Sequence, residues 1–217
     1  SRFMGLKHLL LKGCYFNMPF IFEEIPNRIY PYDEAAFYQS NTAFDAVITS
    51  AETGERVVLS KNEISSIGLN RVLQASSSIP VISKPVDIGG QLYFDGGISD
   101  SIPAKYALER HQKAVVILTR PRGYRKDETG NALFYRQLFR RKPAFMNAIL
   151  SRNAAYNKAL DFCFQMEKEG RLYVIAPSPE YSVGRTERSF KKRADFYNHG
   201  YRLIKEDQER LFRFLNG

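Results

Sequence analysis

The chain has 217 residues, of which 44% are hydrophobic and 25% charged, and this composition excludes an intrinsically disordered protein. Its longest clean apolar run near the centre, residues 114–118, is far shorter than the ~20 residues that cross a bilayer. Residues 1–120 hold 12 basic and 12 acidic side chains, whereas residues 121–217 hold 20 and 11, so the whole excess of +9 lies in the last part. This asymmetry predicts two regions with different surfaces.

The first hundred residues alternate between helical and strand patterns. Helical patterns cover residues 3–12, 19–28, 34–39 and 63–75. Strand patterns cover residues 44–49, 56–59, 85–88 and 91–94, and the short turns between them predict two hairpins. Asp33 is a suitable N-cap for the third helix, and Gly68 is a weak point in the fourth.

After the second hairpin, Pro103 begins a predicted helix that runs to Arg110. Residues 114–119 form a continuous apolar β run, which is typical of a strand buried on both faces. Helices that alternate with strands in this way indicate a layered α/β sheet.

The character of the chain changes after residue 121, where a polar connector leads to two long helical patterns separated by a short strand at 171–175. The apolar stripe of the first helix consists of Phe145, Ile149, Tyr156, Leu160 and Phe164. The seam of the second consists of Phe190, Ala194, Tyr197, Tyr201, Ile204, Gln208, Leu211 and Leu215. Because this seam is aromatic and short, we predict a core-facing helix rather than an intermolecular coiled coil.

Cysteine and histidine are scarce. Cys14 and Cys163 lie far apart among apolar residues, which is typical of buried thiols in a reducing compartment. His8, His111 and His199 show no metal-ligand spacing, so we expect neither a metal nor a cofactor. The first residues lack the pattern of a signal peptide and look like the interior of a domain. We therefore expect a cytoplasmic protein whose upstream part is missing from this sequence.

The stretch Tyr93-Phe94-Asp95-Gly96-Gly97 ends a predicted strand in an acid followed by two glycines. A glycine after the acid can take a positive φ and lets a substrate or another loop approach closely. Asp95 could accept a proton from a nucleophile, or it could cap backbone N–H groups in a tight turn. The spacing of these residues alone favours the capping role of Asp95 over the role of a base.

Several short motifs in a fixed order carry a family resemblance. They are residues 13–16 and 20–26, Thr53-Gly54-Glu55, Ala75-Ser76-Ser77-Ser78-Ile79-Pro80, Asp95-Gly96-Gly97, Pro103, residues 152–157 and residues 184–188. With these motifs the chain resembles the later part of a patatin-like phospholipase, and it is most similar to the bacterial patatin-like predicted esterases.

The resemblance implies an α/β/α three-layer sheet domain that lacks its N-terminal strands, over residues 1–121. A mostly helical C-terminal domain would cover residues 122–217. It also implies a Ser–Asp dyad that hydrolyses lipid or other acyl esters through an acyl-enzyme, without a histidine. Asp95 would be the general base, with Gly96 and Gly97 forming its turn beside the substrate.

The chain departs from the family because no G-x-S-x-G motif occurs in it. The nearest string, residues 97–101, lacks the closing glycine, and Ser76, Ser77 and Ser78 have the context of helix-end residues. We therefore predict that the nucleophilic serine lies outside this chain and that the chain alone is inactive. The alternative is a non-catalytic module that binds lipids or proteins.

Basic clusters at residues 140–142 and 191–193 allow three interpretations. A solvated helix face comes first. Peripheral contact with an anionic membrane comes second, since each charge near such a surface adds roughly 1 kcal/mol. Nucleic acid comes last and is not expected, because no recognisable binding motif accompanies the charge.

Overall fold

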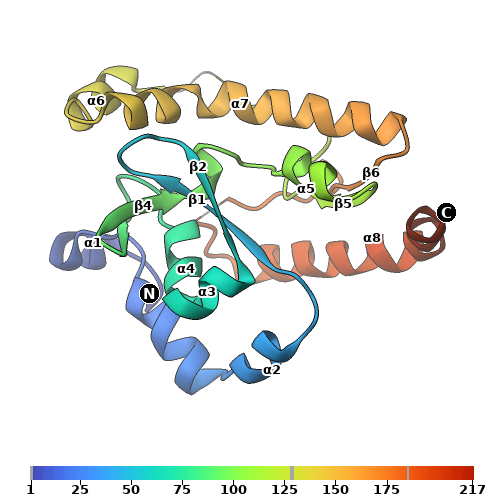
Figure 1. The fold of residues 1–217 in the computed structure, drawn as a ribbon, viewed down its shortest axis with the longest axis horizontal. Coiled ribbons are helices and arrows are strands. Elements are labelled where there is room, and N and C mark those ends of the chain that lie inside the picture. Colours follow the sequence, from blue (N-terminus) through green and yellow to red (C-terminus); the bar gives the residue numbers. More distant parts are fainter. Residues whose placement is uncertain (1, 128–129, 185) are drawn as a thin grey trace. The chain divides into compact units, whose positions relative to one another are not determined.

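The computed structural model describes residues 2–127, 130–184 and 186–217 (Figure 1), so Arg185 of the motif at 184–188 lies outside the described residues. The chain divides into two compact units, each made from two segments. The first contains Ser1–Ser101 and Glu128–Ala155, and the second contains Ile102–Asp127 and Tyr156–Gly217. The predicted domain boundary after residue 121 stays a prediction, because the division into these two compact units does not test it.

The first unit is built on a four-stranded antiparallel sheet in the order β2-β1-β4-β3. The strands are β1 (Asp45–Ser50), β2 (Arg56–Ser60), β3 (Val86–Ile88) and β4 (Gln91–Asp95). Both predicted hairpins are confirmed. β1 is central: it pairs Val47 with Val58 of β2 and Ile48 with Asp95 of β4.

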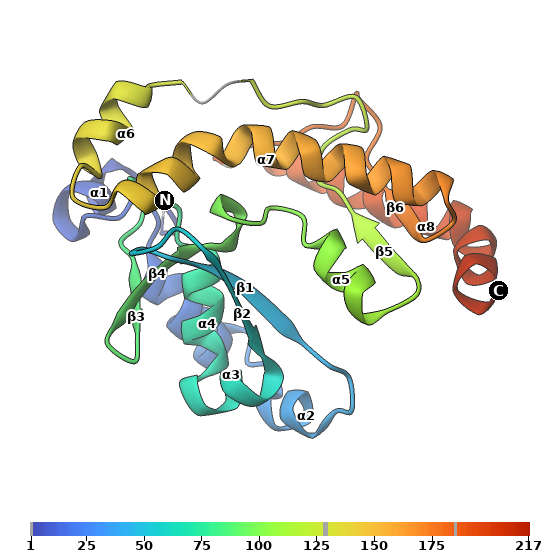
Figure 2. The same ribbon diagram turned by 45° about the horizontal axis from the view of Figure 1, so that its top comes forward.

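Short helices complete the first unit, and Figure 2 shows α3 and α4 beside the hairpin of β1 and β2. The helices are α1 (Leu6–Lys12), the π-helix η1 (Phe20–Ile29), α2 (Glu34–Gln39), α3 (Lys61–Ile67), α4 (Leu69–Ser76), the 3₁₀ turn η2 (Gly96–Ile98) and α6 (Ala132–Leu138). The N-cap prediction is confirmed, because Asp33 Oδ1 accepts from the Ala36 N–H at 2.8 Å. The single helix predicted over 63–75 is wrong: Gly68 has φ 100°, a left-handed value that ends α3 before α4 begins.

Two hydrophobic clusters form the core of the first unit. One packs Ile48 of β1 against Ile64 and Val72 of α3 and α4. The other joins residues of the sheet and the η2 turn to the first part of α7 (Pro143–Lys168), and in it the rings of Phe94 and Phe145 stack with centroids 5.0 Å apart. The chain on both sides of Asp95 is therefore anchored in a packed core.

The second unit contains a two-stranded parallel sheet, β5 (Ala114–Ile117) and β6 (Leu172–Ile175), with helices α5 (Ala104–Arg110), the last part of α7, and α8 (Phe190–Asn216). Its core includes Val116, Leu160 and Leu172. The prediction that residues 114–119 form a strand buried on both faces is wrong. The strand ends at Ile117, whose side chain is 71% exposed, because a sheet of two strands is covered on one face only.

The prediction that the seam of α8 faces a core is also wrong. Phe190, Tyr197, Tyr201 and Leu215 are exposed. His199, on another side of the helix, is buried instead. The mixed α/β fold with a helical C-terminal region is confirmed.

Candidate functional site

Asp95 is the last residue of β4, and its main chain is held from two directions. Its N–H donates to the carbonyl oxygen of Ser78 at 2.9 Å. Its own carbonyl oxygen accepts from Thr49 Oγ1 at 2.8 Å. Since Ser78 follows α4 and Thr49 belongs to β1, two separate elements fix the backbone from which the carboxylate projects.

The carboxylate of Asp95 caps the turn that follows it. Oδ1 accepts from the Gly97 N–H at 2.6 Å, and Asp95 is the N-cap of η2. The side chain is partly buried. This bond fixes the orientation of the carboxylate and uses only part of its capacity to accept hydrogen bonds. A cap and a base are therefore compatible roles for the same side chain.

The two glycines are required by close contacts rather than by a positive φ, which neither residue adopts. A Cβ at Gly96 would lie 2.3 Å from the carbonyl oxygen of Val47, so the strand β1 passes directly against this residue. A Cβ at Gly97 would lie 3.0 Å from Asp95 Oδ1. The predicted close approach is thus made by the protein's own backbone, and contact of these glycines with a substrate stays a prediction.

Thr49 supports the turn through its hydroxyl group, and the sequence analysis did not identify this residue as part of the site. Its side chain is completely buried, and its Oγ1 lies 2.8 Å from Ser99 Oγ. Because the Thr49 hydroxyl proton is donated to the Asp95 carbonyl, Ser99 is the donor in this second bond. The sequence shows a hydroxyl residue, Thr49, within a run of β-branched residues. It does not show the partners of this hydroxyl, because they come from another strand and a turn.

Four serines near the turn use their hydroxyl groups for structure. Ser76 donates to Val47 O at 2.8 Å, Ser78 to Gln74 O at 2.7 Å and Ser101 to Gly97 O at 2.6 Å, while Ser99 bonds to Thr49. The helix-end interpretation of Ser76–Ser78 is confirmed, since α4 ends at Ser76 and Ser77 is its C-cap. A nucleophilic serine must give its proton to a base, which is not what these bonds do.

The loop between α4 and β3 is strained next to Asp95. Val81 has φ 77°, a left-handed value that is unusual for a β-branched residue. The loop is closed by a bond from Ser83 N–H to Ile79 O at 2.8 Å, and its Ile82 carbonyl accepts from Tyr15 N–H at 2.8 Å. Such strain persists only where the surroundings hold it and is common beside functional sites. No pattern in the sequence marks Val81.

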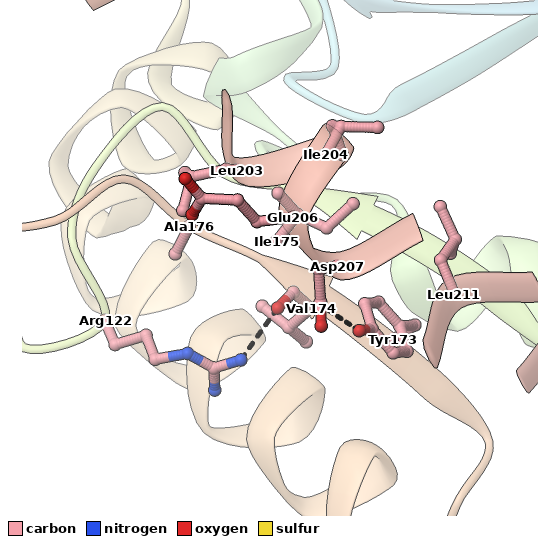
Figure 3. A pocket seen from close by; sticks show the side chains of 10 residues that line it. All are labelled: Arg122, Tyr173, Val174, Ile175, Ala176, Leu203, Ile204, Glu206, Asp207 and Leu211. Carbon is pink, nitrogen blue, oxygen red and sulfur yellow. Dashed lines mark hydrogen bonds between the residues drawn. The ribbon is translucent and has the colours of Figure 1, made fainter. Parts of the chain in front are cut away.

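The second unit has a cavity of about 300 Å³ lined by β6 and α8 (Figure 3). Two of its charged side chains, Arg122 and Asp207, already have partners. Arg122 forms two bonds of 2.6 and 2.7 Å with Glu167 and donates to Val174 O at 2.7 Å, and the Tyr173 hydroxyl donates to the Asp207 carboxylate. Arg122 holds the pKa of Glu167 below its ordinary value, while burial and then Asp207 raise the pKa of Tyr173. We assign no ligand to this cavity, because Arg122 and Asp207 are used in stabilising the unit.

Other kinds of site find no support in the described part of the chain. Among the residues with assigned positions, no three His, Cys, Asp or Glu side chains are grouped to bind a metal. A search of the same residues for a helix with the length and apolarity of a membrane span found none.

The fold and the turn define a mixed α/β domain that presents a fixed carboxylate at the end of a strand. Residues 6–108, which include all four strands of the first unit and the Asp95 turn, match the family model described as patatin-like phospholipase. This stretch of the chain is therefore similar to the patatin-like phospholipases, and the predicted resemblance is confirmed. Residues 142–216 match a model described as a domain of unknown function, DUF6363. A search of the curated proteins found no match.

Proposed function

We propose that Asp95 is the general base of a patatin-like lipid acyl hydrolase and that Gly96 and Gly97 shape its turn. The main support is the fixed position of the carboxylate: the bonds to Ser78, Thr49 and Gly97 hold both its backbone and its Oδ1. A base held in this way needs little reorganisation when it accepts a proton. The family match supports lipid hydrolysis in general, and the residue role is our proposal.

In the proposed reaction a serine hydroxyl attacks the acyl carbonyl while Asp95 takes its proton. The C–O bond to the alcohol breaks, the proton passes to the departing oxygen, and an acyl-serine ester remains. Water then attacks this ester while Asp95 accepts its proton, the acyl C–O bond to the serine breaks, the proton passes to the serine oxygen, and the fatty acid is released. These steps need no cofactor.

The nucleophile is proposed to come from residues outside this 217-residue chain, because no G-x-S-x-G occurs within it. The chain alone is therefore expected to be inactive. A fluorophosphonate probe tests this directly: the isolated chain should remain unlabelled, and a serine labelled in it would contradict the proposal.

The substrate is proposed to be a lipid or another acyl ester, with no nucleic-acid partner. We also propose a cytoplasmic location, since Cys14 and the buried Cys163 are both reduced thiols. Peripheral contact with an anionic membrane through the basic C-terminal region belongs to the same proposal. Its competitor is a non-catalytic lipid- or protein-binding module, in which Asp95 only caps Gly97.

One substitution distinguishes the hydrolase from the binding module. It is made in a protein that includes both this chain and the proposed serine. Asp95→Asn keeps an oxygen that can accept from Gly97 but removes the base. We expect hydrolysis of a p-nitrophenyl acyl ester to fall about 10²- to 10⁴-fold, with an unchanged thermal unfolding midpoint. Asp100→Asn is the control, because Asp100 lies five residues away and pairs with Arg56 at 2.7 Å. Full activity of the Asp95→Asn enzyme would support the binding module.

A further inference from the structure

Helix α8 has a large apolar face that is exposed in the described structure, although its Ile204 also lines the cavity between β6 and α8. Its members are exposed aromatic or aliphatic side chains: Phe190, Tyr197, Tyr201, Ile204, Phe212 and Leu215. At 3.6 residues per turn they fall within roughly 80° of the helix circumference. We call this set the exposed α8 face.

Another side of α8 fixes the helix in the unit. His199 is buried, stacks on Tyr181 with ring centroids 4.0 Å apart and accepts from the Ser178 N–H at 3.0 Å. Nearer the C-terminus, the ring of Phe214 contacts that of Tyr173 at 5.4 Å. Since these contacts position α8, the exposed α8 face is not needed to hold the helix in place.

The charge around this face favours an anionic partner. Helix α8 carries seven Lys and Arg against four Asp and Glu, within a region, 121–217, that holds the whole positive excess of the chain. Arg193 and Lys205 flank the face, each roughly 60° from its centre on the helical wheel. A second copy would bring positive charge against positive charge, which is unfavourable across an interface.

We propose that the exposed α8 face docks on an anionic lipid bilayer, with the helix axis parallel to the membrane. A helix with an aromatic face and basic residues beside it is the type that lies in the membrane interface. The Tyr and Phe rings would lie at the level of the headgroups. Arg193 and Lys205 would face the lipid phosphates. The inference extends the proposed membrane contact by assigning its residues, and it does not require Asp95 to be catalytic.

Co-sedimentation of the 217-residue chain with vesicles tests the proposal. Vesicles of phosphatidylglycerol and phosphatidylcholine in equal parts should bind the chain, and vesicles of phosphatidylcholine alone should bind it much more weakly. Combining Tyr197→Ser with Tyr201→Ser should weaken binding to the anionic vesicles about tenfold or more. Arg193→Gln and Lys205→Gln should each weaken it about fivefold.

The matched control is Tyr30→Ser, because Tyr30 in the first unit is 78% exposed and Tyr197 is 74% exposed. This control should bind as the unmodified chain does, and circular dichroism should show equal helix content in all variants. The proposal is overturned if the chain binds neither vesicle, if it binds both equally, or if the paired tyrosine variant binds undiminished. It is also overturned if sedimentation velocity shows a dimer that the paired variant abolishes, since a second copy would then occupy the face.

Discussion

The Asp95 turn and the contact between β6 and α8 are stabilised by different interactions. The turn is held by the Thr49 hydroxyl on the Asp95 carbonyl, by the Gly97 N–H on the Asp95 carboxylate, and by the close packing of Gly96 on β1. The other contact uses the bond from the Tyr173 hydroxyl of β6 to Asp207 of α8, and beside it Arg122, paired with Glu167 of α7, donates to Val174 O of β6. Neutral buried bonds do not respond to pH or salt, whereas charged, partly exposed pairs do. We infer that the turn holds the Asp95 carboxylate in a fixed position for chemistry. The stability of the second unit, by contrast, depends on pH and salt.

The largest predicted effect on stability is that of Gly96→Ala. The added Cβ would lie 2.3 Å from the carbonyl oxygen of Val47, which cannot move away easily because Val47 is paired with Val58 in the sheet. Overpacking against backbone should lower the free energy of unfolding by about 3 kcal/mol, measured by urea denaturation.

Gly123→Ala is the control for this substitution, because a Cβ at Gly123 would meet nothing within 4 Å. It should change the free energy of unfolding by no more than about 0.5 kcal/mol. Equal stabilities of the two variants would show that the contact between Gly96 and β1 does not stabilise the turn.

Thr49→Val should have the second largest effect. Valine has nearly the same shape but cannot donate to the Asp95 carbonyl or accept from Ser99, so the buried bonds of Thr49 to both groups are lost. The free energy of unfolding should fall by about 2 kcal/mol. Thr49→Ser keeps the hydroxyl and loses a methyl group, with an expected cost of about 1 kcal/mol. If the serine variant were the less stable one, packing rather than the hydroxyl would be the role of Thr49.

Elements with a strong local signal could be predicted from the sequence. The Asp33 cap located α2, and the glycine turn before Gln91 located the hairpin that ends in Asp95. The support that Thr49 gives to Asp95 could not be predicted, because it depends on which strands become neighbours. The buried side of α8 was mispredicted for a related reason. A helix with apolar residues on two sides does not reveal which one meets a sheet, and β6 selected the side of His199 and Phe214.

The smallest predicted effect, that of Glu167→Gln, tests whether pH distinguishes the two regions. Glu167 accepts both bonds from Arg122, and its pKa lies below the ordinary value of 4.5 chiefly because of them. The unfolded chain therefore binds more protons between the two pKa values, and stability rises with pH across that range. Since Arg122 is half exposed, we expect the variant to be less stable by about 1 kcal/mol at neutral pH.

As the pH falls through the lowered pKa, Glu167 is protonated in the folded protein and its advantage over glutamine disappears. Urea denaturation at pH 7 and pH 3 should therefore show the deficit of Glu167→Gln shrinking, while Glu180→Gln, at an exposed surface position, shows little deficit at either pH. The deficit of Thr49→Val should stay constant over the same range, because no titrating group takes part in its bonds. If the Glu167→Gln deficit also stayed constant, the charge of Glu167 would contribute nothing, and the contrast between the neutral Thr49 bonds and the charged second unit would fail at its best-defined ion pair.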